Sequence, residues 1–117
     1  MAPPTLEQIQ ERIATPDGFV GFLKTKDNSE VMGSPKHPRC CPIAHYLISL
    51  GLSGVWVEGL SLQFRIVWEV RFIGTPPWMS SFIAAVDSTD EVGSFGTVSV
   101  GVCLGFLDQL QLVSSLA

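Results

Sequence analysis

The sequence predicts a single α+β domain in which helices flank a small antiparallel sheet and pack on one of its faces. Its 117 residues have the length of one domain, and 46% of them are hydrophobic, which is ample for one core. Several segments place apolar residues at helical spacing, whereas residues 55–72 alternate apolar and polar side chains as strands do. We therefore expect one domain over residues 1–117, with a β-hairpin at about residues 55–72.

Two short helices are expected at the start of the chain. The first, over residues 5–14, begins at Thr5, which is followed by Gln8 in the spacing of a capping box. One face of this helix is apolar and carries Leu6, Ile9 and Ile13. Pro16 is typical of a first helical turn, and the second helix that it opens reaches about Lys24.

A third helix is expected after a loop. Residues 25–39 are rich in turn-forming residues and are predicted to be mostly loop, with a brief strand at residues 30–32. Residues 42–50 then follow helical spacing, with apolar side chains at Ile43, Tyr46, Leu47 and Leu50. Gly51 is well placed to end this helix, because glycine commonly occupies the position after a helix.

The sheet is expected to consist of a short strand at residues 55–58 and a long strand at residues 62–72, joined by a turn at residues 59–61. One face of the long strand is apolar and consists of Leu62, Phe64, Ile66, Trp68, Val70 and Phe72. The other face consists of Gln63, Arg65, Val67, Glu69 and Arg71. Such alternation favours an antiparallel sheet with one buried face. Because the second strand is the longer one, we expect part of it to overhang or to pair with another chain.

The last third of the chain predicts two more elements. A helix begins near residues 75–77 and ends at residues 87–90, with its apolar repeat at Trp78, Phe82 and Val86. The following segment is ambiguous, because Val98, Val100 and Val102 alternate as a strand would. Val100 also belongs to a helical pattern, because Val100, Leu104 and Leu107 lie on one face of a helix. We favour a helix over about residues 99–113, because residues 104–112 contain no β-branched side chain.

Six large aromatic side chains at periodic positions are expected to form the core between the sheet and the helices. They are Trp56, Trp68, Trp78, Phe64, Phe72 and Phe82. Because tryptophan is over-represented among binding hot spots, some of them are also candidates for interface anchors.

The charge distribution indicates the kind of partner. The net charge is −4, and residues 74–117 hold no Lys or Arg but four acidic residues, namely Asp87, Asp90, Glu91 and Asp108. This asymmetry favours a protein partner with a basic patch, or head-to-tail self-association into a homo-oligomer. Nucleic acid is disfavoured as the main ligand, because phosphate binding needs clustered Lys and Arg.

A membrane span is not expected, since the longest uncharged stretch, residues 40–57, is interrupted by Pro42, Gly51 and Gly54. No secretory signal is visible behind the first residues. The cysteines number three, and two of them are adjacent, so a disulfide framework is disfavoured. We therefore expect reduced thiols and a cytoplasmic location.

The segment from His37 to His45 concentrates the residues that could perform chemistry. A structural metal site would use His37, Cys40, Cys41 and His45, because zinc prefers four thiolate or imidazole ligands. Adjacent cysteines cannot easily face one ion, and no Cys-x-x-Cys pair is present. The sequence therefore predicts no metal and no cofactor, with Cys41 and Cys103 in the core and His37 in solvent.

A reactive thiol is the second hypothesis for this segment. Cys41 precedes the helix at residues 42–50, where free amides and the helix dipole stabilise a thiolate. His37 and His45 are the candidate bases, but a nucleophile also needs a fixed geometry and an orienting third group. Nothing in the sequence supplies that geometry.

The prediction for function is a small non-enzymatic protein-interaction module, acting as an adaptor, an inhibitor or a regulatory subunit. Inhibitors encoded by phages or mobile elements belong to this class. The candidate binding residues are Arg65, Trp68, Glu69, Arg71, Asp87, Asp90 and Glu91. The first alternative is a thiol-dependent enzyme or redox sensor centred on Cys41, and the second is a small structural metal-binding protein.

Overall fold

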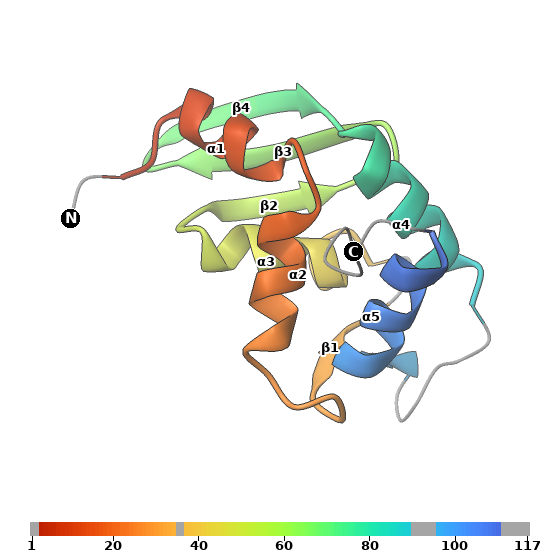
Figure 1. Cartoon of the computed structure of the whole chain (residues 1–117). Helices are drawn as coiled ribbons and strands as arrows, with labels where there is room; N and C mark the ends of the chain where they lie inside the picture. Colours follow the sequence, from red (N-terminus) through yellow and green to blue (C-terminus); the bar gives the residue numbers. More distant parts are fainter. Residues whose placement is uncertain (1–2, 35–36, 90–95, 111–117) are drawn as a thin grey trace.

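Two antiparallel sheets and the helices around them make up the part of the chain that the computed structural model describes, residues 3–34, 37–89 and 96–110 (Figure 1). The helices are α1 (Leu6–Ile13), α2 (Asp17–Lys24), α3 (Pro42–Ser49), α4 (Pro77–Asp87) and α5 (Val100–Gln109). The strands are β1 (Val31–Gly33), β2 (Ser53–Val57), β3 (Ser61–Ile66), β4 (Glu69–Gly74) and β5 (Val98–Ser99). The predicted α+β fold class is confirmed.

The larger sheet has the order β2-β3-β4, so each strand pairs with its neighbour along the chain. The β3–β4 register runs without a break from Ser61 opposite Gly74 to Ile66 opposite Glu69. The smaller sheet pairs β1 with β5, and thus joins segments that are more than half of the chain apart. Its pairing continues into the loop before β1, because the amide of Val100 donates to the carbonyl of Glu30 at 2.9 Å.

The helices begin and end where the local sequence chemistry indicates. Thr5 and Gln8 form the predicted capping box at the start of α1, each bonding the backbone amide of the other. Pro42 occupies the first turn of α3, and Gly51, just beyond its end, has φ of +94°, which glycine adopts at little cost. The helix predicted at residues 75–87 is also present, as α4.

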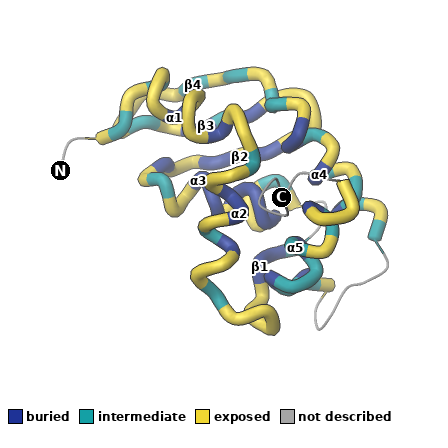
Figure 2. Tube along the Cα trace, in the orientation of Figure 1, coloured by how far each residue is buried: buried dark blue, intermediate teal, exposed yellow. Residues whose placement is uncertain are grey.

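The core lies between the larger sheet and the helices (Figure 2). Its largest fully buried side chains are Phe19, Phe64, Phe82, Ile9, Ile13, Leu23, Ile43, Leu47, Leu62, Met79, Leu107 and Val86. Phe19 of α2 is central, because its ring lies 5.1 Å from the ring of Phe82 and 5.3 Å from that of Tyr46, centroid to centroid. The buried Trp78 ring donates its indole N–H to the carbonyl of Ile13 at 2.7 Å, so α4 is tied to the end of α1.

The prediction of one long strand at residues 62–72 is wrong. The chain reverses at Val67 and Trp68, so these residues form a two-residue turn between β3 and β4. Val67 has φ of +60°, an unusual conformation for a β-branched residue. Ile66 and Glu69 pair across the turn, so their side chains lie on the same face of the sheet although one residue number is even and the other odd. Even-numbered residues therefore point to the core in β3, and odd-numbered residues do so in β4.

The ambiguous segment near the end of the chain contains both of the structures that its pattern indicates. Val98 and Ser99 form strand β5, and helix α5 follows at once. The switch occurs at Ser99, whose hydroxyl accepts a hydrogen bond from the amide of Val102 as an N-cap does. The predicted helix is confirmed as far as Gln109, and residues 111–113 lie outside the described residues.

None of the helices within residues 3–34, 37–89 and 96–110 has the length and apolar character needed to cross a membrane.

Candidate functional site

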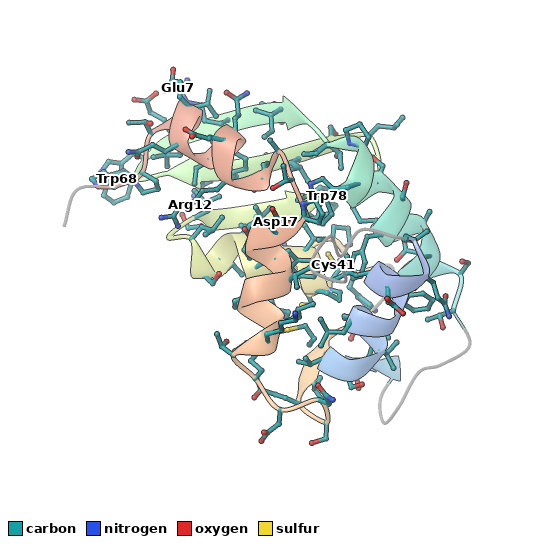
Figure 3. All side chains as sticks on the ribbon, in the orientation of Figure 1. Glu7, Arg12, Asp17, Cys41, Trp68 and Trp78 are labelled. Atoms are coloured by element: carbon teal, nitrogen blue, oxygen red, sulfur yellow. The ribbon has the colours of Figure 1, made fainter. Side chains whose placement is uncertain are left out.

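The side of the larger sheet that faces away from the core carries a row of apolar side chains open to solvent. The exposed fractions are 38% for Trp56, 41% for Val70 and 69% for Phe72. Trp68, at the turn beside this row, is 89% exposed and points away from the interior that holds Cys41 and Trp78 (Figure 3). We call these four residues the outer patch. The prediction that Trp56, Trp68 and Phe72 belong to the core is wrong, whereas Phe64, Trp78 and Phe82 are buried as expected.

Charged groups hold one end of the outer patch in place. The indole N–H of Trp56 donates to a carboxylate oxygen of Glu58 at 2.7 Å. The guanidinium of Arg39 lies over the Trp56 ring, 5.5 Å from its centroid, which is a cation–π contact. Because both groups fix the ring, Trp56 is a preformed part of the surface and loses little side-chain freedom when a partner covers it.

The predicted binding residues that the structure describes lie at different places in the fold. Arg65 is exposed on the outer side of β3, next to the outer patch. Glu69 and Arg71 lie on the opposite side of β4, because their register partners are Ile66 and Phe64. They form an ion pair with each other. Asp87 lies at the end of α4, and Asp90 and Glu91 lie outside the described residues.

The segment from His37 to His45 is a turn that leads into α3. The amides of Cys40 and Cys41 both donate to the carbonyl of His37, at 3.1 and 2.9 Å. Cys41 is the buried N-cap residue of α3, whereas His37, Cys40 and His45 are exposed. Within the described parts of the chain, no three His, Cys, Asp or Glu side chains converge as a metal site requires. The four predicted ligands, all of them described, thus do not converge on one point.

A small cavity of about 270 Å³ brings Cys41 together with His37 and with Asp87 of α4. Sequence reasoning did not place Asp87 here, because 46 residues separate it from Cys41. The combination of thiol, imidazole and carboxylate invites comparison with a nucleophilic site. The surroundings of Cys41, however, disfavour the thiolate that a nucleophilic site needs. Burial raises the pKa of the Cys41 thiol and the Asp87 charge raises it further, although amides of α3 act in the other direction.

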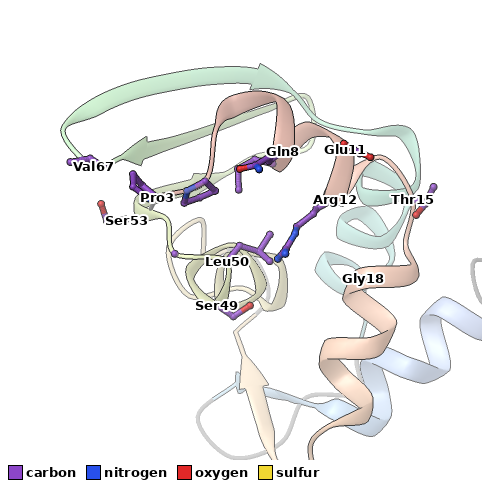
Figure 4. Close-up of a pocket in the computed structure, with 13 residues that line it drawn as sticks. Pro3, Gln8, Glu11, Arg12, Thr15, Gly18, Ser49, Leu50, Ser53 and Val67 are labelled. Carbon is purple, nitrogen blue, oxygen red and sulfur yellow. The ribbon is translucent and has the colours of Figure 1, made fainter. Parts of the chain in front are cut away.

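A second, wider cavity of about 1130 Å³ opens between α1, the start of α2, the end of α3 and the β3–β4 turn (Figure 4). Arg12 extends into it from α1, and Glu11 next to it is the other charged residue of the lining. Burial raises the pKa of the nearby Tyr46 phenol, and the Arg12 charge partly opposes this shift. Because the two lining charges are of opposite sign, the cavity does not concentrate charge for an ionic ligand.

No known family, curated protein or solved structure matches this chain. Any inference about function must therefore come from the geometry and chemistry of its own residues. Among the features described above, the outer patch consists of large apolar side chains open to solvent, and burial of apolar surface is favourable.

The three cysteines are expected to differ strongly in reactivity. Cys40 is exposed, whereas burial raises the pKa of Cys41 and raises that of Cys103 to about 12. A thiol must be both accessible and deprotonated to react with an alkylating agent. At neutral pH, native protein should therefore take up one iodoacetamide label, on Cys40, and three after unfolding, which mass spectrometry of peptides detects. Fast labelling of Cys41 in the native state would contradict this and would favour the thiol enzyme.

Proposed function

We propose that this chain is a small non-enzymatic protein-interaction module, an adaptor, inhibitor or regulatory subunit, that binds a partner protein through the outer patch. The observation that carries the proposal is the row of Trp56, Trp68, Val70 and Phe72 open to solvent on one side of a sheet. Large aromatic residues gathered on a surface are typical of protein interfaces, and tryptophan is the most enriched residue among hot spots.

The surroundings of the outer patch also suit a protein partner. Arg39 and Glu58 lie at its Trp56 end, and Gln63 and Arg65 of the middle strand β3 lie between Trp56 and the β4 residues. Protein interfaces combine apolar contacts with polar groups and hydrogen bonds, so charges of both signs among the aromatic residues suit a protein partner. A small-molecule site, by contrast, is concave, whereas this surface is the face of a sheet.

The remaining features of the proposal rest on charge and on the thiols. A net charge of −4 favours a partner with a basic patch, which the acidic residues near the end of the chain would attract at long range. The free cysteines are suited to a reducing compartment, so we assign the protein to the cytoplasm as part of this proposal. The thiol-enzyme alternative has less support, because burial raises the pKa of Cys41.

Removing an aromatic side chain of the outer patch is expected to weaken partner binding while the fold is kept. Trp68→Ser and Phe72→Ser should each weaken binding by about 30-fold, the effect of losing a hot spot of about 2 kcal/mol. The protein is used as bait in lysate of its host, and the stoichiometric partner is then titrated by calorimetry against each variant.

Leu60→Ser is the matched control for this experiment. Leu60 is as exposed as Trp68, at 89%, but it lies in the β2–β3 turn, outside the outer patch. The control should bind the partner as the unaltered chain does. If the partner tolerates both aromatic substitutions, or if no stoichiometric partner is retained, the proposed function is wrong.

A further inference from the structure

The two edges of the larger sheet differ in how they are protected. The β2 edge has an irregular register between Ser53 and Trp56, and the amide of Val57 donates to the carbonyl of Pro38 at 2.9 Å. A bulge and a covering loop are the usual devices that keep an edge strand from pairing with another chain. The β2 edge is therefore closed by the chain itself.

The β4 edge has none of these devices among the described residues. β4 is six residues long, contains no proline and, among the strands of the described segments, pairs with β3 alone, in an unbroken register. In an antiparallel ladder, alternate residues direct their N–H and C=O groups away from the neighbouring strand. Since Ile66 and Glu69 flank a two-residue turn and pair with each other, Val70 is the first residue of β4 to present these groups at the free edge.

The side chains along this edge complement a second copy of themselves. When two β4 strands lie antiparallel about a two-fold axis at Val70, Glu69 of one copy lies opposite Arg71 of the other. The same register sets Trp68 opposite Phe72 on the other face of the sheet. Opposite charges and aromatic pairs at such positions stabilise strand pairing. A two-fold axis at Arg71 would instead place two guanidinium groups opposite each other.

Arg71 itself has an unused donor. Its Nε–H is buried and has no hydrogen-bond partner within the part of the chain that the structure describes, although the guanidinium forms an ion pair with Glu69 of its own strand. A guanidinium has five donors and commonly binds carboxylates with two of them at once. Because the Arg71 side chain as a whole is 43% exposed, a second carboxylate can bind the solvent-facing N–H groups of its guanidinium, although it cannot reach the buried Nε–H.

We propose that two copies of this chain associate through β4, antiparallel and centred on Val70, so that one sheet runs through both copies. The pairing buries Trp68 and Phe72 of each copy and leaves the Trp56 end of the outer patch open. It rests on the proposed function, because it names a second copy of the chain as one partner of the outer patch. Two identical strands satisfy the two-fold symmetry that most homodimers have.

Charge reversal at the two paired positions tests the pairing and its register. Glu69→Arg gives a chain with two positive charges on this strand, and Arg71→Glu gives a chain with two negative charges. Each variant alone should dimerise at least about tenfold more weakly than the unaltered chain, because like charges then lie opposite each other. An equimolar mixture of the two should form a heterodimer. Sedimentation velocity over a concentration series measures each association, and circular dichroism checks that both variants are folded.

The double variant Glu69→Arg with Arg71→Glu guards against a misfolded single variant. It keeps one charge of each sign on every strand, so it should dimerise as tightly as the unaltered chain. A monomeric unaltered chain overturns the proposal, as does a mixture that associates no better than its components. If the chain is monomeric but binds a different protein, and the Phe72→Ser variant no longer binds that protein, the proposed function stands without the dimer. If the chain dimerises as expected and binds no other protein, the β4 pairing stands alone.

Discussion

Replacing Phe19 with alanine is expected to lower the free energy of unfolding by about 3–5 kcal/mol. Phe19 is fully buried, and its ring contacts Tyr46 of α3 and both Trp78 and Phe82 of α4. The substitution removes most of a side chain from the point where three helices meet and leaves a cavity that the surrounding rings fill only in part. A domain of this size is stable by about 5–15 kcal/mol, so the loss is a large part of the total.

Denaturant unfolding followed by tryptophan fluorescence measures this loss, since Trp78 lies beside Phe19. Phe72→Ala, measured at a protein concentration low enough to keep the chain monomeric, is the matched control, because it removes the same atoms from a side chain that is 69% exposed in one copy. The control should change the free energy of unfolding by less than about 1 kcal/mol. Equal losses for the two variants would contradict the assignment of Phe19 to the core and of Phe72 to the outer patch.

Gly33→Ala is expected to destabilise the protein by about 2–4 kcal/mol, from backbone strain and steric overlap together. Gly33 has φ of +132°, a backbone conformation that residues other than glycine rarely adopt. An added Cβ would also overlap the carbonyl oxygen of Cys40, which is backbone and cannot rotate aside. The end of β1 would have to move away from the turn at residues 37–41, which positions Cys41 and covers the β2 edge.

Gly21→Ala is the control for this substitution. Gly21 lies in α2, and nothing is within 4 Å of the position that its Cβ would occupy. Alanine there should raise the free energy of unfolding by about 0.5–1 kcal/mol, because glycine is a poor helix former. Thermal unfolding monitored by circular dichroism compares the two variants. A Gly33→Ala protein as stable as the unaltered chain would mean that β1 does not lie against the turn as described.

Local chemistry was sufficient to predict the helices. The capping box at Thr5, the proline at the start of α3 and the glycine after it act within a few residues of where they stand. The arrangement of the candidate site residues was harder to predict from the sequence. Cys41 and Asp87 line one cavity because the tertiary fold brings the end of α4 near the start of α3, and no spacing along the chain encodes this.

The outer patch shows most clearly what depended on the tertiary structure. The sequence by itself determined that residues 62–72 alternate and that half of their side chains are apolar. It did not determine which side chains face solvent, because Val67 and Trp68 are not turn-forming residues and give no sign of the reversal. Pairing of β4 with β3 decided this, since a two-residue turn exchanges the two faces of the strand that follows it. Trp68, Val70 and Phe72 are exposed for that reason.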